Sequence, residues 1–83
     1  MDLVGSSYLA REKNFRTVFI TYFESLEVFA KAYVVDEDIA KDMVQEVFAN
    51  LWVKRSSLPQ QLDLKSYLYQ STRNNCLNHL KQL

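Results

Sequence analysis

The segment from Asp36 to Arg55, DEDIAKDMVQEVFANLWVKR, decides the fold of this chain. It contains neither glycine nor proline, begins with three acidic residues and ends with Lys54 and Arg55. Negative charge near the N-terminus of a helix and positive charge near its C-terminus both favour the helix macrodipole. The segment is therefore predicted to be a helix that Asp36 caps.

The predicted helix has two different sides when its residues are placed at about 100° per residue. One side is apolar and is expected to face the core: Ala40, Met43, Val44, Val47, Phe48 and Leu51. The other side, which we call the acidic stripe, holds acids, an amide and one small residue: Asp38, Asp42, Gln45, Glu46 and Ala49. We interpret the stripe as a surface for a basic partner, because carboxylates form charge-assisted hydrogen bonds with basic side chains. The alternative is a solvated helix face.

The last turn of this helix is open to two interpretations. Trp52 and Val53 fall on the polar side of the helical wheel. Either Trp52 closes the core against the following helix, or both residues extend the partner-facing surface.

A helix is also predicted before this segment. From Glu12 onward, apolar residues recur in steps of three and four, as in an amphipathic helix: Phe15, Val18, Phe19, Tyr22, Leu26, Phe29 and Tyr33. Phe23 lies off this series, which suggests a bend or a second contact. The β-branched pair Val34 and Val35 ends the pattern and fits a short extended connection. Residues 1–11 show no clear periodicity and are expected to be a flexible N-terminal tail.

A third helix is predicted after a polar loop over residues 56–62 that contains the only proline, Pro59. Asp63 is a good N-cap for the segment LKSYLYQSTRNNCLNHLKQL. Its apolar stripe is predicted to be Leu64, Leu68, Thr72, Cys76 and either His79 or Leu80. The expected fold is all-α, a compact bundle of three main helices.

Composition limits the possible classes of protein. The 83 residues suffice for one small domain, and a hydrophobic content of 48% can supply its core. A single glycine argues against hairpin turns, and a single cysteine rules out an internal disulfide and favours a reducing compartment. The net charge of zero hides an asymmetry: residues 1–53 have nine acids and five bases (−4), whereas residues 54–83 have one acid and five bases (+4). This division suggests two different partners, although solubility alone can also produce it.

Catalysis is not expected from this sequence. It has one histidine, one cysteine and no glycine-rich phosphate loop, and its acids do not follow a metal-binding spacing. Cys76 is interpreted as a small buried residue, and His79 as a structural or solvated one. No catalytic residue, metal, cofactor or small-molecule substrate is predicted.

Nucleic-acid binding is a stronger candidate. Five basic residues of the C-terminal part could contact phosphates: Lys54, Arg55, Lys65, Arg73 and Lys81. The amides of Asn74 and Asn75 could read base edges, and Tyr67 and Tyr69 could stack on an unpaired base. The alternative is a solvated helix face, with the tyrosines in the core and Asn74 in a structural hydrogen bond.

The motif from Asp36 to Trp52 resembles region 2.2 of bacterial sigma factors, most closely the extracytoplasmic-function (ECF) group. Residues 66–80, SYLYQSTRNNCLNHL, look like regions 2.3 and 2.4, and Phe15 to Tyr33 looks like region 2.1. The resemblance covers residues 12–83, with 2.1 at about 12–35, 2.2 at about 36–55, a loop at 56–62, and 2.3–2.4 at about 63–83. The Tyr-Leu-Tyr and Arg-Asn-Asn-Cys-Leu-Asn strings are similar to the ECF factors of Bacteroidetes.

This resemblance implies a transcription initiation factor domain that is not an enzyme. The acidic stripe would dock on the arginine-rich clamp helices of the RNA polymerase β′ subunit, with Ala49 allowing close approach. Regions 2.3 and 2.4 would recognise the promoter −10 element and help to melt it, with Asn74 on the non-template strand. The DNA-binding residues implied in this way are Lys54, Arg55, Ser66, Tyr67, Gln70, Arg73, Asn74 and Lys81, with a loop that would surround a flipped base: Ser56, Ser57, Leu58, Pro59, Gln60, Gln61 and Leu62.

The sequence also departs from the family pattern. Tyr67 stands where many ECF factors have Trp, and Gln70 stands where a basic residue is common. A complete ECF factor continues to region 4, a helix-turn-helix domain, which is not expected here. The family further implies a bacterial cytoplasmic protein that is nucleoid-associated when active and held by an anti-sigma factor, in some members at the inner membrane. The rival hypothesis is a helical protein–protein interaction module without DNA binding.

Overall fold

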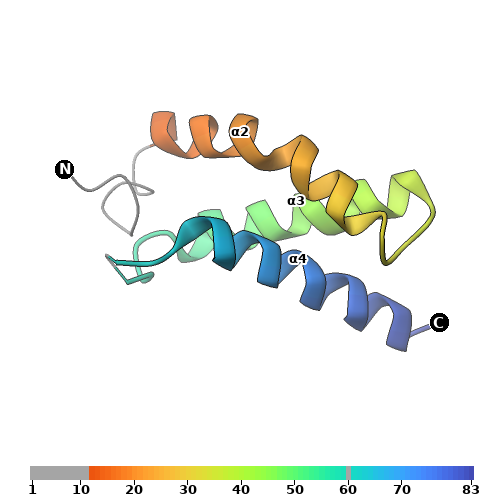
Figure 1. Cartoon of the computed structure of the whole chain (residues 1–83). Coiled ribbons are helices and arrows are strands. Elements are labelled where there is room, and N and C mark those ends of the chain that lie inside the picture. The colour runs from red at the N-terminus through yellow and green to blue at the C-terminus, as the bar shows by residue number, and fades with distance from the viewer. Residues whose placement is uncertain (1–11, 60) are drawn as a thin grey trace.

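The computed structural model describes residues 12–59 and 61–83, which form three helices. Helix α2 spans Glu12–Ala30, α3 spans Glu37–Lys54 and α4 spans Leu64–Lys81. Each helix packs against the other two, and short connections make α2 and α3, and then α3 and α4, run in opposite directions (Figure 1). This confirms the predicted all-α bundle. The flexible tail predicted at residues 1–11 lies outside the described residues.

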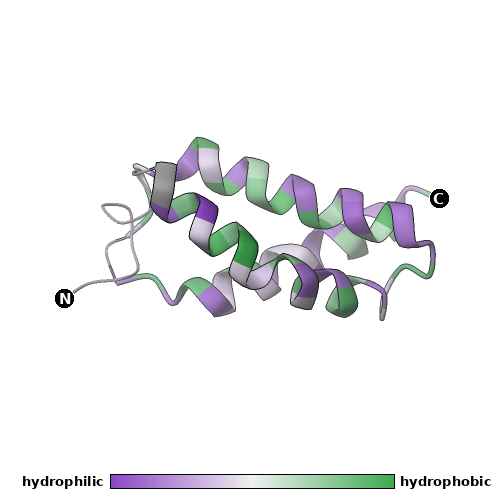
Figure 2. Cartoon of the chain, turned by 90° about the horizontal axis from the view of Figure 1, so that it is seen from above, coloured by the Kyte–Doolittle hydropathy of each residue, from purple (hydrophilic) through white to green (hydrophobic). Residues whose placement is uncertain are grey.

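The core lies where the three helices meet. Its large, fully buried side chains include Leu26 of α2, Leu51 of α3 and Leu68 of α4. The apolar side predicted for α3 is confirmed, since Ala40, Val44, Val47, Phe48 and Leu51 are all buried and Met43 is half-buried. Figure 2 shows hydrophobic and hydrophilic residues alternating along the helices, as expected of helices that each turn one face to a core.

Helix α4 contributes one stripe of buried residues to the core. Leu64, Leu68, Thr72 and Cys76 are buried as predicted, whereas His79 is half-buried and Leu80 is 40% exposed. The Thr72 hydroxyl donates a hydrogen bond to the Leu68 carbonyl at 2.8 Å, which satisfies a polar group that would otherwise be costly to bury. Burial also raises the pKa of the Cys76 thiol, in keeping with its predicted role as a packing residue.

Aromatic rings join α2 to α3. Phe15, Phe19 and Phe23 surround Phe48, with ring centroids 6.2, 4.8 and 6.3 Å away. Phe23 also stacks on Phe19 at 5.0 Å, so its position off the main series reflects a second contact. Edge-to-face and offset pairs of this kind stabilise a core beyond their buried area.

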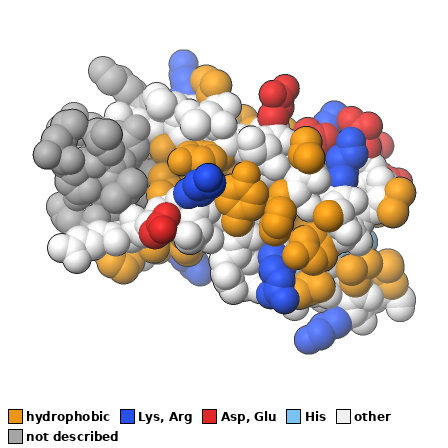
Figure 3. All heavy atoms as spheres, in the orientation of Figure 1, with side chains coloured by type: hydrophobic (Ala, Val, Ile, Leu, Met, Phe, Trp, Pro, Cys, Tyr) orange, Lys and Arg blue, Asp and Glu red, His pale blue; other side chains and the backbone are white. Residues whose placement is uncertain are grey.

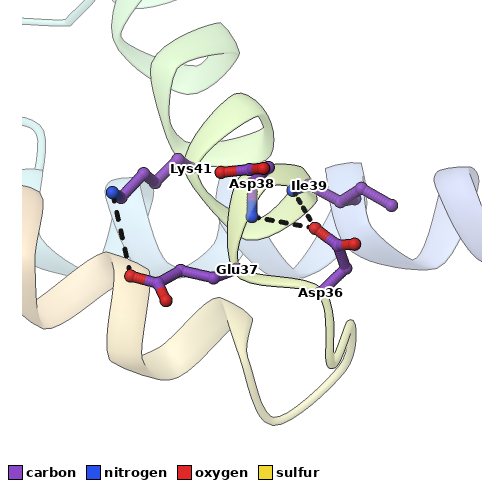
Figure 4. Close-up of polar contacts among 5 residues, drawn as sticks. All are labelled: Asp36, Glu37, Asp38, Ile39 and Lys41. Atoms are coloured by element: carbon purple, nitrogen blue, oxygen red, sulfur yellow. Dashed lines mark hydrogen bonds and ion pairs between the residues drawn. The ribbon is translucent and has the colours of Figure 1, made fainter.

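The helix ends follow their capping residues. The Asp36 carboxylate accepts hydrogen bonds from the backbone N–H groups of Asp38 and Ile39, at 2.9 and 3.1 Å, and Lys41 pairs with Glu37 at 3.7 Å (Figure 4). The Asp63 carboxylate likewise accepts from the Ser66 backbone at 3.2 Å. Both predicted N-caps are thus confirmed.

The first helix is shorter than the periodic pattern predicted. The α-helix ends at Ala30, and the N–H groups of Ala32 and Tyr33 bond to the carbonyls of Phe29 and Ala30, three residues back. This tighter turn leaves Val34 buried and Val35 91% exposed before α3 begins. Hydrophobic spacing could not reveal the change, because Tyr33 still packs against the core after the α-helix has ended.

Candidate functional site

The acidic stripe lies on the outer side of α3. Asp38, Asp42, Gln45, Glu46 and Ala49 are all exposed. Among residues 12–59 and 61–83, the side chains of Asp42, Gln45 and Glu46 make no hydrogen bond or ion pair with the rest of the chain. The stripe therefore presents carboxylates and an amide that are free to meet another molecule, around a position where Ala49 adds little bulk.

The last turn of α3 resolves the two interpretations of Trp52. Its ring packs against Phe15 of α2, with ring centroids 4.9 Å apart, so Trp52 takes part in the packing of α3 on the first helix. The interpretation that placed Trp52 in the core had expected the third helix as its neighbour. The Arg55 guanidinium lies over the same ring, 3.6 Å from its centroid, and donates to the Trp52 carbonyl at 2.6 Å. Val53 is 76% exposed and adds an apolar residue to the outer surface.

The Arg55 side chain is partly withdrawn from solvent by this contact. Arg55 was predicted to contact DNA, but its side chain is half-buried and its Nε has no hydrogen-bond partner within the described part of the chain. A cation held on an aromatic face is stabilised there, and more so when it is partly desolvated. The Arg55 guanidinium is thus already engaged with the Trp52 ring and the Trp52 carbonyl.

A groove of 440 Å³ lies at the start of α4, and we call it the Tyr67 groove. Its lining residues are Leu62, Asp63, Ser66, Tyr67, Gln70, Ser71 and Asn74. It brings together four of the α4 residues singled out for DNA contact and one residue of the loop. Asp63 and Ser71 were missed, although Ser71 lies four residues after Tyr67 and three before Asn74, which places all three on one helix face.

A second groove of 170 Å³ runs between α3 and α4, and we call it the Lys54 groove. Its lining residues are Val47, Asn50, Lys54, Tyr67, Ser71, Asn74 and Asn75. Tyr67, Ser71 and Asn74 border both grooves, so the two are neighbours on the surface. Asn50 was not singled out from the sequence, because its proximity to α4 depends on how the helices pack.

The other predicted DNA-binding residues are more dispersed. Arg73 and Lys81 are exposed on α4 but line neither groove, and Leu58 of the loop packs against the core together with Leu62. Ser56, Ser57, Pro59 and Gln61 are exposed, and Gln60 lies outside the described residues. The Ser57 hydroxyl donates to the Lys54 carbonyl at 3.0 Å and so closes the end of α3.

Two residues suggested for base contact are used in packing. The Tyr69 ring lies edge-on to Phe29 of α2, with centroids 4.9 Å apart. The Asn75 amide donates to the Met43 carbonyl of α3 at 3.3 Å. Tyr67 and Asn74 instead line both the Tyr67 groove and the Lys54 groove.

The surface charge is also unevenly placed. In Figure 3 acidic side chains gather toward the end of the molecule where α2 ends and α3 begins, with basic side chains among them, and other basic side chains lie over α4. The residues that the structure describes contain no cluster of His, Cys, Asp or Glu that could hold a metal ion. None of the described helices combines the length and the hydropathy that a membrane span requires.

Comparison with known proteins gives one result. Residues 19–83 match the family model described as Sigma-70 region 2, and this match covers α3 and α4 completely together with most of α2. Comparisons with curated proteins and with solved structures give no match. The matched residues include the acidic stripe and both grooves.

Proposed function

The chain belongs to the sigma-70 region 2 family of transcription initiation factors, which bind RNA polymerase and recognise promoters, and we propose specific roles for its two surfaces. The acidic stripe docks on the clamp helices of the β′ subunit. The Tyr67 groove and its surroundings hold the non-template strand of the −10 element. The family match carries this proposal, and the placement of the two surfaces supports it.

The chemistry of the acidic stripe suits a partner rich in arginine. Asp42 and Glu46 offer carboxylates with no partner among the described residues, and Gln45 adds an amide between them. Arginine binds carboxylates through two parallel hydrogen bonds, which fix the orientation of the partner as well as adding affinity. Because the buried side of α3 is held in the core, the stripe needs little rearrangement to bind, and preorganisation of this kind increases affinity.

The chemistry of the Tyr67 groove suits an unpaired base. Tyr67 can stack on the base, and the side chains of Gln70, Ser71 and Asn74 can form hydrogen bonds with its edge. Lys54, in the adjoining groove, places a positive charge beside the strand. Exposing a base costs a few kcal/mol, so a site that captures it favours strand opening without any nucleotide hydrolysis.

Finer features of the family are part of the same proposal. We assign the chain to the ECF group, with similarity to factors of Bacteroidetes, and regions 2.1, 2.2 and 2.3–2.4 to the three helices in order. An anti-sigma factor that covers these faces, in the cytoplasm or at the inner membrane, would regulate such a domain. An association with the nucleoid follows whenever polymerase is bound.

The test of the acidic stripe is a binding measurement with a purified β′ clamp-helix fragment. The double variant Gln45→Ala/Glu46→Ala is expected to lose at least about thirtyfold in affinity, since truncation at an interface hot spot costs about 2 kcal/mol or more. A matched control, Glu24→Ala/Ser25→Ala, removes an acid and a polar side chain from the exposed face of α2 and should bind normally. Circular dichroism should be the same for all three proteins. Normal binding by the stripe variant would refute this role for α3.

The test of the Tyr67 groove is a titration with single-stranded −10 DNA and with a scrambled strand. The parent is expected to prefer the −10 strand, and Asn74→Ala is expected to reduce that preference by about tenfold, the effect of losing one to two kcal/mol of base contact. Equal affinity of the parent for both strands, together with intact clamp binding, would favour the helical interaction module without DNA binding.

A further inference from the structure

A third groove lies between α3 and the last turns of α4, and we call it the Glu46 groove. It has a volume of 230 Å³ and is lined by Met43, Glu46, Asn75, Asn78, His79 and Gln82. The Asn75 side chain of α4 reaches α3 here, since its amide donates to the Met43 carbonyl at 3.3 Å. The groove is therefore bordered by two helices whose spacing is held by a hydrogen bond.

The lining of this groove favours a cation. Among the described residues that line it, Glu46 is the one acid, and none is a lysine or an arginine. The side-chain oxygens of Asn78 and Gln82 are hydrogen-bond acceptors, and the Met43 side chain offers an apolar surface for methylene groups. A guanidinium is planar and has five donors but no acceptor, so it fits a groove that combines one carboxylate with several neutral acceptors.

The neighbouring groove has the opposite preference. The Lys54 groove contains one cation and no acid, and Asn75 borders both it and the Glu46 groove. The two grooves between α3 and α4 thus meet at Asn75 and carry formal charges of opposite sign. An anion such as a DNA phosphate is favoured on the Lys54 side, and a basic side chain is favoured on the Glu46 side.

We propose that the Glu46 groove accepts an arginine side chain of the polymerase clamp helices, so that the end of α4 takes part in an interface otherwise formed by α3. The proposal rests on the proposed function, because it extends the docking site of the acidic stripe. Glu46 belongs to both surfaces, so the groove opens directly from the stripe. Asn78 then acts as a specificity residue, since its side-chain oxygen can accept a hydrogen bond from one of the several N–H donors of a planar guanidinium.

The first experiment compares two asparagines that lie one turn apart on α4 and are both exposed. Asn78→Ala is expected to weaken binding of the β′ clamp-helix fragment by about tenfold or more, as for the loss of one hydrogen bond to a charged group. Asn74→Ala is expected to weaken −10 DNA binding while leaving the affinity for the fragment within twofold. Both changes introduce alanine at an exposed helix position, where it favours helix formation.

A second experiment identifies the partner atom. Each arginine on the docking face of the fragment is replaced by glutamine and measured against the parent and the Asn78→Ala protein. One arginine should show coupling, so that its replacement and Asn78→Ala together cost at least threefold less than the product of the two separate effects. A conservative replacement by lysine at the same position should restore only part of the affinity.

The outcomes distinguish this inference from the function on which it rests. If Gln45→Ala/Glu46→Ala abolishes binding while Asn78→Ala binds the fragment within twofold of the parent, the groove has no role and the stripe keeps its own. If Asn78→Ala weakens binding but no arginine couples to it, the inference of an arginine ligand is overturned. If neither protein is impaired, both proposals fail.

Discussion

The acidic stripe on α3 and the grooves along α4 are built in different ways. All five stripe residues come from one helix, and each is exposed because the other side of that helix is buried. The Lys54 and Glu46 grooves instead combine residues from two helices, such as Glu46 with Asn78 and Lys54 with Tyr67. A site on one helix depends on helix formation, whereas a site between helices also depends on their packing.

This difference explains why the two kinds of site respond differently to change. The shape of the grooves depends on buried residues and on the Asn75–Met43 hydrogen bond. The stripe depends on the register of α3 alone, which the Asp36 cap and the buried face determine. Substitutions that alter the packing of the helices, or only the surface of α3, can therefore separate the two kinds of site.

The largest effect is expected from Leu68→Ala, which breaks the support of the grooves. Leu68 is completely buried in α4, and a Leu→Ala change in a core costs about 3 kcal/mol of unfolding free energy, within a range of about 2–5. Urea denaturation followed by circular dichroism measures the loss. Val53→Ala is the control, because Val53 is 76% exposed and should change stability by no more than about 0.5 kcal/mol. Equal losses in both variants would contradict the location of the core.

Glu46→Lys is expected to have the next largest effect, on binding. Glu46 belongs to the stripe and to the Glu46 groove, so reversal of its charge places a cation opposite a basic partner. Affinity for the clamp-helix fragment should fall by about thirtyfold or more, about 2 kcal/mol, while affinity for −10 DNA should not fall. Glu24→Lys, an equal reversal on the exposed face of α2, should show no loss of affinity for the fragment. A loss of DNA binding in the Glu46 variant would show that the two surfaces are not separate.

Tyr67→Leu tests the grooves without disturbing the stripe. Leucine keeps an apolar side chain where Tyr67 packs against the core, but it cannot stack on a base. Affinity for −10 DNA should fall by about tenfold, within the 1–3 kcal/mol associated with base stacking. Fluorescence anisotropy of labelled DNA gives the measurement. Tyr67→Trp should retain the affinity, and equal losses in the Leu and Trp variants would argue that packing and not stacking was removed.

The smallest effect is expected from Asp36→Ala, which removes the N-cap of α3. The Asp36 carboxylate accepts two backbone hydrogen bonds, and loss of such a cap costs about 1 kcal/mol of unfolding free energy. Glu37→Ala breaks only an exposed ion pair with Lys41 and should cost less, about 0.3–0.5 kcal/mol. Chemical denaturation distinguishes the two. Because neither residue belongs to the stripe, both variants should bind the clamp-helix fragment normally at a temperature at which they are folded.

Features of the fold that depend on residues close in sequence could be predicted, because the interactions that produce them lie within one helical turn. The caps Asp36 and Asp63, the buried face of α3 and the burial of Cys76 depend on periodicity and on neighbours within one turn, and all were predicted. The end of α2 at Ala30 was missed, because the residues that follow it continue the hydrophobic pattern through a tighter turn. Local spacing cannot distinguish these two backbone paths when both bury the same side chain.

Contacts between helices were predicted less well. One of two interpretations placed Trp52 against the third helix, whereas its ring packs on Phe15 of the first. Arg55 was predicted to contact DNA, and its contact with the Trp52 ring was not foreseen. The Asn75 amide and the Tyr69 ring are side chains of the kind that contact bases, yet both contact other helices. Each of these side chains could have been exposed to solvent or packed against another residue. Which of the two occurs depends on residues that are distant in the sequence.

Helix periodicity and short-range hydrogen bonding suffice to predict several features of this protein. These are the three helices, two of their caps, the buried face of α3 and the exposure of the acidic stripe. Only the tertiary structure decided which asparagines and aromatic residues remain accessible, and where α3 and α4 leave grooves of opposite charge. The physical reason is that a groove between helices forms from residues far apart in the chain, at a spacing that only the packed core sets.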